Sequence, residues 1–343
     1  MKKVMIGMSG GVDSAVSAYL LKEQGYEVTG VTLRLCNENA CDVSDAKAVA
    51  DKIGVAHVAD DMSDKFTQTV VADFIESYKN GGTPNPCIVC NKHIKFGAML
   101  DYALDNGMDY IATGHYAIID RNENGRYLLR KAKDESKDQT YVLYSLTQNQ
   151  LSHVLFPLGE FSKSEVRAIA EEQGLINAHK RDSQDICFVP DGDYAGFIER
   201  YTGESFPHGS FVDLKGNVLG EHKGIIKYTV GQRKGLGIAL GKPAFVCSKN
   251  VENNTVTLGE NSDLFSKTLT AHDVNLISVE TIDVPMRVSA KVRYNQKEQP
   301  ATVTSIGENR IKVEFDEPQR AISKGQSVVL YDGDIVVGGG IID

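Results

Sequence analysis

The run Ser9-Gly-Gly-Val-Asp-Ser14 constrains what this chain can fold into more than any other segment. It follows an apolar stretch at residues 4–8 that is typical of a buried strand, and apolar residues at helical spacing continue after it to a stop at Gly25. Gly10 and Gly11 let the backbone approach an anion closely, while the first turn of the helix presents free N–H groups and the positive end of its dipole. The sequence therefore predicts a phosphate-binding turn between a strand and a helix.

Two familiar phosphate loops do not fit this run. It lacks the lysine of the GxxxxGK[ST] loop and the glycine spacing of the GxGxxG loop. An isolated Gly-Gly is usually only a tight turn, but here two serines and an aspartate accompany the glycines. The run resembles the pyrophosphate loop of the ATP-pyrophosphatases, enzymes that cut ATP between its α and β phosphates to adenylate a carbonyl-type oxygen.

The order of strand-like and helix-like segments predicts the fold class, α/β followed by β. Apolar strands at residues 26–35, 56–59 and 110–113 alternate with helical patterns at residues 45–53 and 65–78, which predicts a parallel sheet covered on both faces. Residues 122–125 predict the turn of a hairpin, and a capping box of Ser162 and Glu165 predicts the start of another helix. Beyond about residue 205, short strand-like stretches and glycine turns replace the helical periodicity, and from about residue 263 they are consistent with a small barrel. A chain of 343 residues is too long for one core. We expect three domains, residues 1–204, 205–262 and 263–343.

Composition limits the compartment and the partners. No apolar run approaches the roughly 18 residues of a membrane span, and the chain starts in its first strand, so we expect a cytoplasmic protein with no membrane partner. Its net charge of −9 argues against nonspecific coating of nucleic acid, although an acidic protein can carry a basic face. Six cysteines are too few for a disulfide scaffold of this size, which favours catalytic or metal-binding roles for some of them.

Two cysteine-bearing segments and one glycine are candidates for chemistry. In the segment TPNPCIVCNKHIKF, at residues 83–96, two prolines are expected to exclude a helix until about Asn91 and to hold Cys87 and Cys90 on a loop. Cys187 lies in a second polar loop, residues 181–188. Gly114 and His115 follow a predicted strand, at the end where open α/β sheets bind ligands, although a lone histidine there is also compatible with a purely structural role.

Two features of the second half are candidates for RNA contact. Alternation at residues 287–295 predicts one cationic strand face, and the glycine-rich loop at residues 228–238 presents Arg233 and Lys234. Both are equally compatible with ordinary solvated surface.

A family resemblance emerges when the motifs are taken together. In order along nearly the whole chain, seven motifs resemble those of the tRNA 2-thiouridylase family, MnmA/TrmU: GMSGGVDS, TPNPCIVCNKHIKF, ATGHY, SKDQTY, SQDICF, GQRKGLGI and GGGIID. The resemblance implies an ATP-pyrophosphatase domain, a small central β domain and a C-terminal β barrel. It also implies an enzyme, a tRNA-uridine sulfurtransferase that replaces the 2-oxygen of the wobble uridine with sulfur and converts ATP to AMP and pyrophosphate.

The resemblance assigns roles residue by residue. Cys187 corresponds to the cysteine that carries the persulfide and Cys90 to its partner, which resolves the S–S bond into a cysteine disulfide; Asp13 would help to position Mg²⁺. The implied ATP contacts are Gly7, Met8, Ser9, Gly10, Gly11, Val12, Asp13, Ser14, Leu33 and Gly114. The implied tRNA contacts are Asn85, Pro86, Cys87, His115, Lys137, Asp138, Gln139, Arg293, Tyr294 and Gln326. The implied partners are tRNAs for glutamate, glutamine and lysine and a sulfur donor protein such as a cysteine desulfurase or a relay protein.

Cys87 departs from the family pattern. Many members carry aspartate there, which is thought to act as an acid or base, and a thiol could move a proton if its pKa were lowered. The change also creates a set of three thiols, Cys87, Cys90 and Cys187. Related thiolases with three cysteines hold a [4Fe–4S] cluster, so the same reaction with a cluster on these residues is the alternative to the persulfide relay. A structural zinc site with His93 or Asp185 as fourth ligand is the third possibility.

Two other functions remain open from the sequence. An ATP-pyrophosphatase ligase acting on a small molecule would not need Cys90 and Cys187, and a noncatalytic RNA-binding protein would not need an intact SGGVDS run. Cys36, Cys41 and Cys247 have no assigned role and are expected to be structural.

Overall fold

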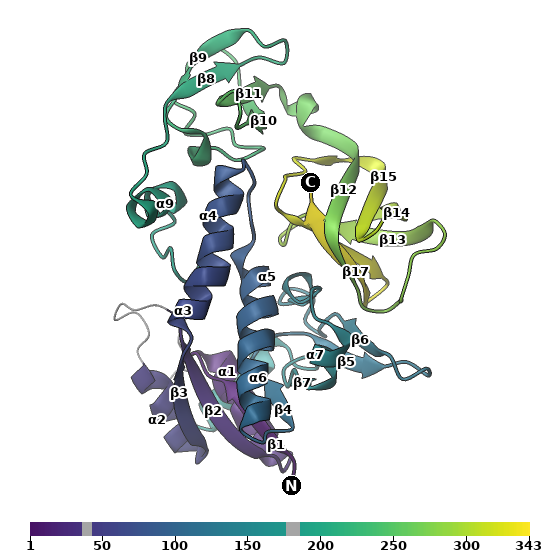
Figure 1. Ribbon diagram of the computed structural model, residues 1–343. Coiled ribbons are helices and arrows are strands. Elements are labelled where there is room, and N and C mark those ends of the chain that lie inside the picture. Colours follow the sequence, from purple (N-terminus) through teal and green to yellow (C-terminus); the bar gives the residue numbers. More distant parts are fainter. Residues whose placement is uncertain (36–42, 176–185) are drawn as a thin grey trace.

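The computed structural model describes residues 1–35, 43–175 and 186–343. Figure 1 shows a parallel sheet with its helices, a pair of long helices rising from it, a small β domain beyond their far end and a barrel beside them. No helix in these described stretches is long and apolar enough to cross a membrane. Cys36, Cys41 and residues 181–185 of the second cysteine loop lie outside the described residues.

The N-terminal domain is built on five parallel strands in the order β3-β2-β1-β4-β7, which confirms the predicted parallel sheet. Val4 and Ile6 of the central strand β1 are fully buried, as an apolar run between two helical layers requires. The strand order reverses between β1 and β4, and in open α/β sheets ligands bind at the carboxyl ends of strands at such a point. The strands are β1 (Lys3–Gly7), β2 (Glu27–Arg34), β3 (Ala56–Asp61), β4 (Tyr110–Ala112) and β7 (Val154–Leu155).

Helices cover this sheet. Helix α8 packs against α1, and its Ser162 and Glu165 form the capping box that the sequence predicts. The shorter helices are α1 (Val12–Glu23), α2 (Val43–Ile53), η3 (Thr140–Val142), α7 (Gln148–Ser152), α8 (Lys163–Glu172) and α9 (Tyr194–Thr202). The two long helices each contain a π-helical stretch, in the orders α3 (Ser63–Phe66), η1 (Thr67–Val71), α4 (Ala72–Lys79) and α5 (Pro86–Cys90), η2 (Asn91–Ala98), α6 (Met99–Asp105).

The second long helix corrects the prediction for the first cysteine segment. It begins at Pro86 rather than near Asn91, so Cys87 and Cys90 lie on a helix and not on a loop. A proline at the first helical position removes an N–H that no helical hydrogen bond uses, and its fixed φ suits the helix. Asn85 caps the helix, because its side-chain oxygen accepts a hydrogen bond from the backbone N–H of Cys87 at 3.2 Å.

The rest of the chain is rich in β structure, as predicted. The central domain has the strand order β10-β11-β8-β9, and β12-β15-β14-β13-β16-β17 close into a barrel through the pairing of β12 with β17. The central elements are β8 (Gly209–Val212), β9 (Val218–His222), η4 (Ile225–Lys227), β10 (Phe245–Asn250), β11 (Thr255–Gly259) and η5 (Asn261–Leu264). The barrel strands are β12 (Phe265–Leu276), β13 (Met286–Lys291), β14 (Gln299–Gly307), β15 (Arg310–Arg320), β16 (Ser327–Asp332) and β17 (Ile335–Ile342).

The predicted cationic strand face at residues 287–295 is wrong in its extent. β13 ends at Lys291, and the chain turns so that the backbone N–H of Gln296 donates to the carbonyl of Arg293. Arg287, on the strand itself, forms a bidentate pair with the carboxylate of Asp316 at 2.8 Å. Alternation alone could not show where the strand stops or which acidic side chain faces it.

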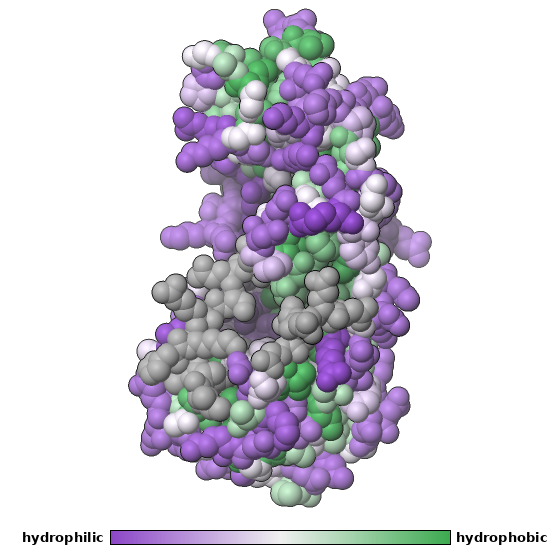
Figure 2. Space-filling model, turned by 90° about the vertical axis from the view of Figure 1, so that its left-hand side faces the viewer, coloured by the Kyte–Doolittle hydropathy of each residue, from purple (hydrophilic) through white to green (hydrophobic). Residues whose placement is uncertain are grey.

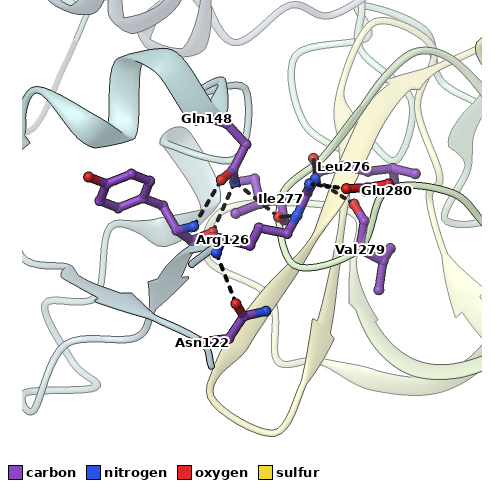
Figure 3. Close-up of polar contacts among 8 residues, drawn as sticks. Asn122, Arg126, Gln148, Leu276, Ile277, Val279 and Glu280 are labelled. Atoms are coloured by element: carbon purple, nitrogen blue, oxygen red, sulfur yellow. Dashed lines mark hydrogen bonds and ion pairs between the residues drawn. The ribbon is translucent and has the colours of Figure 1, made fainter. Parts of the chain in front are cut away.

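The barrel is joined to the N-terminal domain by a continuous sheet. The hairpin of β5 (Ile118–Arg121) and β6 (Tyr127–Arg130), which the sequence predicts with its turn at residues 122–125, adds to β17 through the pairing of Arg130 with Ile335. Arg126 reinforces this junction (Figure 3). Its guanidinium donates to the carbonyls of Leu276 (3.2 Å), the last residue of β12, and of Ile277 (2.6 Å) and Val279 (2.7 Å), which follow that strand.

We expect Arg126→Ala to lower the free energy of unfolding by roughly 2–4 kcal/mol, because it leaves half-buried carbonyls without their charged donor. Calorimetry should show a lower melting temperature or a separate transition for the barrel. Arg121→Ala is the matched control, since Arg121 lies exposed on the neighbouring strand and its guanidinium bonds to Tyr127 of the same hairpin. Equal melting behaviour of the two variants would contradict this role for Arg126.

Lys249 on β10 joins the central domain to the end of the first long helix. Its ammonium donates to the carbonyl of Gly82 at 3.3 Å and lies 6.0 Å from the ring centre of Tyr78. Burial lowers the pKa of Lys249 from 10.5 to about 8. The folded protein therefore loses this proton at a lower pH than the unfolded chain does, and the charge destabilises the fold at neutral pH.

We expect Lys249→Met to raise the free energy of unfolding at pH 7 by about 1 kcal/mol. Because stability of the unmodified protein recovers as pH rises from about 8 toward 10.5, the difference should shrink across that window. Denaturant unfolding at several pH values measures it, with the exposed Lys242, which pairs with Glu260, replaced by methionine as control. A difference that stays constant from pH 7 to above 10 is inconsistent with a depressed pKa.

Candidate active site

The predicted phosphate loop lies between β1 and α1, at the carboxyl edge of the sheet. Gly10 has a φ of +71°, a conformation that favours glycine. Gly11 is the N-cap of α1 and has no side chain to cap it, so the first N–H groups of the helix receive no side-chain cap. Ser14 closes the turn internally: its hydroxyl donates to the carbonyl of Gly11 at 3.1 Å and accepts from the N–H of Ser9 at 3.3 Å. Such a turn is suited to an anion.

Gly114 brings the end of β4 directly against this loop. A Cβ atom at Gly114 would lie 2.9 Å from both the carbonyl carbon of Asp13 and the backbone nitrogen of Ser14. Both are backbone atoms that cannot turn aside, so the close approach requires glycine. Leu33, near the carboxyl end of β2, lies at the same edge of the sheet. The structure therefore brings together the three segments that the resemblance assigns to ATP.

Asp13 has partners that the sequence did not reveal. The ammonium of Lys163 donates to its two carboxylate oxygens at 2.7 and 2.8 Å, and the hydroxyl of Tyr116 donates to Oδ1 at 2.8 Å. Lys163 is only 8% exposed. The Ser162–Glu165 capping box predicts the helix on which Lys163 lies, but no local pattern shows which other segment that helix contacts.

The three candidate cysteines lie in different environments. Cys87 is exposed in the first turn of α5, whereas Cys90, one turn later, is 7% exposed and packs in the main hydrophobic cluster. Burial raises the pKa of the Cys90 thiol; nearby Lys95 opposes that rise and Cys87 adds to it. The expectation that Cys90 lies on a loop is therefore wrong, because Cys90 lies on a helix that turns it toward the core.

Cys187 is exposed beside an aromatic anchor. The ring of Phe188 packs edge-on against Phe66 and Phe74, at centroid distances of 5.6 and 5.2 Å, and also contacts Phe197 of α9. Figure 2 shows hydrophobic surface near the middle of the face that bears α3 and α9. The anchor holds the chain on the carboxyl side of Cys187 against the first long helix.

The cysteines do not form a ready metal site. Among residues 1–35, 43–175 and 186–343, no group of three His, Cys, Asp or Glu side chains lies close enough to hold a metal ion. Cys87, Cys90 and Cys187 are all described, so as placed they do not fit a [4Fe–4S] cluster or a zinc ion; the proposed zinc ligand Asp185 lies outside the described residues. A Mg²⁺ ion does not need such a set, because it is commonly bound by one or two carboxylates together with substrate phosphates.

The residues assigned to tRNA gather where the N-terminal domain meets the barrel. The hydroxyl of Tyr294 donates to the carbonyl of Asp138 at 3.4 Å, and the Gln326 side chain donates to the carbonyl of Thr83 at 2.6 Å, close to Asn85 and Pro86. Gln139 is tied to Tyr116 by two hydrogen bonds. Lys137 and Asp138 are half-buried in the same segment. The structure thus assembles one region from segments more than 200 residues apart.

Within this region some assigned residues already have protein partners. The Arg293 guanidinium donates to the carbonyls of Val230 and Ala321 and to the hydroxyl of Ser323, so it links the central domain to the barrel. His115 is 8% exposed; its Nδ1 lies 2.7 Å from the Thr113 hydroxyl, and burial holds its pKa well below the usual value. Burial also raises the pKa of Asp138. A tRNA contact by Arg293 or His115 would need rearrangement or would run through the backbone.

The cationic loop of the central domain, residues 228–238, borders this region, because the carbonyl of Val230 accepts a hydrogen bond from Arg293. Arg233 and Lys234 are exposed on it, and Arg233 lines an open pocket together with apolar residues such as Leu236 and Leu240. The arrangement leaves both cations accessible to a phosphate backbone.

Comparisons with known proteins cover nearly the whole chain. Family models match in three successive segments: the tRNA methyl transferase HUP domain (residues 2–191), the tRNA methyl transferase PRC-barrel domain (195–260) and the aminomethyltransferase beta-barrel domain (266–342). Among curated proteins, the chain is similar to the tRNA-specific 2-thiouridylase MnmA of Clostridioides difficile, with 55% identity over 100% of this chain and 98% of that protein. It is also similar to the proteins of that name from Acetivibrio thermocellus, at 54% identity, and Clostridium acetobutylicum, at 52% identity, each with 99% of both chains covered.

Proposed function

Because this chain belongs to the MnmA family of tRNA-specific 2-thiouridylases, we propose that it is a tRNA-uridine sulfurtransferase that uses ATP to convert the wobble uridine of tRNA to 2-thiouridine. The observation that supports the proposal most is the close backbone contact between Gly114 and the SGGVDS loop, at the point where the strand order reverses. The residues assigned to tRNA lie on the adjoining segments. We propose residues 1–204 as the catalytic domain, with 205–262 and 263–343 as the central and barrel domains.

The first step activates a poor electrophile. The 2-oxygen of the uracil attacks the α phosphorus of ATP, the bond to the β phosphate breaks, and pyrophosphate leaves while the base loses its N3 proton. The 2-oxygen then belongs to an AMP leaving group. The uncapped N–H groups of α1 and the glycines of the loop would bind the phosphates. Asp13 would hold Mg²⁺ together with the phosphates, and the ion would supply charge neutralisation at the leaving group.

The second step uses two sulfur atoms. The terminal sulfur of a persulfide on Cys187 attacks C2 of the uridine, and AMP leaves with the former 2-oxygen. The Cys90 thiolate then attacks the Cys187 sulfur, which releases 2-thiouridine and leaves a Cys90–Cys187 disulfide. A thiol reductant and a sulfur donor protein restore the persulfide. Because Cys90 is buried and its pKa is raised, this step requires Cys90 to become accessible once tRNA is bound.

Cys87 lies on α5 one turn before Cys90. It lies exposed at the start of α5. Burial raises the pKa of the Tyr294 hydroxyl, and Asp138 and Cys87 nearby add to that rise. We propose that it exchanges the N3 proton in place of the carboxylate that other members carry. We also propose a cytoplasmic location and tRNAs for glutamate, glutamine and lysine as substrates.

Transfer of a labelled oxygen tests the proposed activation. A tRNA whose wobble uridine carries a heavy oxygen isotope at O2 should yield AMP that contains the isotope, in an amount equal to the 2-thiouridine formed. AMP without the label would show that ATP is hydrolysed by water and would refute adenylation of the base. Nucleoside analysis of the same sample separates thiolation from methylation, the chemistry named in two of the domain descriptions.

A further inference from the structure

A lysine from a distant segment lies against the SGGVDS loop. The SGGVDS run lacks the lysine that follows the glycines in GxxxxGK[ST] loops. Helix α8 brings Lys163, 150 residues further along the chain, to the first turn of α1, where its ammonium bonds both oxygens of Asp13. At 8% exposure it is the one buried lysine among the described residues.

The position of this ammonium is fixed from several sides. Lys163 is the first residue of α8, held there by the capping box of Ser162 and Glu165, and its backbone N–H donates to the carboxylate of Asp134 at 3.0 Å. Its Nζ lies 5.8 Å from the ring centre of Tyr116, whose hydroxyl bonds the same carboxylate. The side chain therefore reaches the loop in a set direction rather than as a mobile surface cation.

A purely structural ion pair is the competing explanation. Stability alone gives little reason for it, because a buried ion pair is often no more stabilising than apolar residues of the same volume. The place of the pair is more informative. It lies next to uncapped helix N–H groups and to the glycine contact at Gly114, where the phosphates of ATP would bind in the proposed function.

We propose that Lys163 is the phosphate-binding lysine of this loop and contacts the β and γ phosphates of ATP, the part that leaves as pyrophosphate. This inference rests on the proposed function. In the nucleotide-free state Asp13 holds the ammonium; when Mg²⁺ and ATP bind, Asp13 turns to the ion and Lys163 is released to the phosphates. A cation there stabilises the charge that accumulates on pyrophosphate as the bond to the α phosphorus breaks.

Equilibrium binding of ATP and AMP tests the inference without relying on turnover. Calorimetric titration of Lys163→Met should show ATP binding weakened about 10- to 100-fold, the value of a charge-assisted hydrogen bond, with AMP binding unchanged within about threefold. Lys133→Met is the matched control, because Lys133 is exposed and pairs with Glu165, which lies on α8 like Lys163. The ratio of ATP affinity to AMP affinity in this variant should equal that of the unmodified chain.

A double-mutant cycle separates direct contact from action through Asp13. In an Asp13→Asn background, adding Lys163→Met should still lower the ATP-to-AMP affinity ratio, and that double variant leaves no unpaired buried charge that would prevent folding. If Lys163→Met has no effect on the ratio in either background, the lysine is structural and the inference is overturned. If it has an effect only when Asp13 is intact, Lys163 acts by positioning Asp13, which also overturns it. Failure of the unmodified chain to bind ATP would instead refute the proposed function.

Discussion

Replacing Cys187 with serine is expected to lower the rate of 2-thiouridine formation by about 10³-fold or more, because a hydroxyl cannot carry the transferable sulfur. Release of AMP and pyrophosphate from ATP in the presence of tRNA should continue for at least the first turnover, since adenylation precedes the sulfur step. Single-turnover assays that follow labelled ATP and modified tRNA in the same sample measure the two effects together.

The same assay applies to Cys90 and to a control. Cys90→Ser should also block release of product, but with a covalent tRNA–Cys187 adduct that reducing agents break. Cys247→Ser is the control, because Cys247 lies half-buried in the central domain, with its sulfur 3.6 Å from the carbonyl of Phe245. Full 2-thiouridine formation by both the Cys90 and Cys187 variants would contradict the persulfide relay.

Gly114→Ala is expected to lower the ATP-dependent rate by about 10²-fold, because a methyl group 2.9 Å from the backbone of Asp13 and Ser14 must displace the phosphate loop, and a displacement near 1 Å has an effect of that order. Stability should fall much less, by about 1–3 kcal/mol. Titration with ATP and rates of AMP formation at saturating tRNA measure the effect.

Gly220→Ala is the matched control for this variant. A Cβ atom at Gly220, on β9 of the central domain, would meet only the flexible end of the Ile238 side chain, at 2.8 Å. That side chain can move aside, so the rate of AMP formation should remain near that of the unmodified chain. Equal losses in the two variants would mean that the Gly114 contact does not position the loop.

Local sequence patterns predicted the elements whose cause is local. The apolar run of β1, the glycine turn, the helix stop at Gly25 and the capping box at Ser162 are all set by neighbouring residues, and the structure confirms each. The predictions of a strand over residues 287–295 and of a loop over residues 83–90 were wrong, because each depends on more than the local residue types. The end of a strand depends on where its partner strand ends. A proline disrupts the interior of a helix, but it is favoured at the first helical position.

The site required contacts between distant segments, which no local pattern contains. Sequence motifs placed Asp13 in the phosphate loop, but its pairing with Lys163 depends on how α8 packs on α1. The same limit applies to Cys90, whose burial follows from the face that α5 turns to the core, and to Arg293, whose guanidinium bonds two other segments. Residue type indicated that these positions matter, whereas tertiary packing decides what each one contacts.

The most direct test of the account is mass spectrometry of nucleosides from tRNA incubated with this chain, Mg²⁺ and a persulfide donor, with and without ATP. The account predicts 2-thiouridine at the wobble position only when ATP is present, with one AMP formed for each sulfur transferred. Absence of 2-thiouridine in the complete reaction, or its formation in equal amounts without ATP, would contradict it.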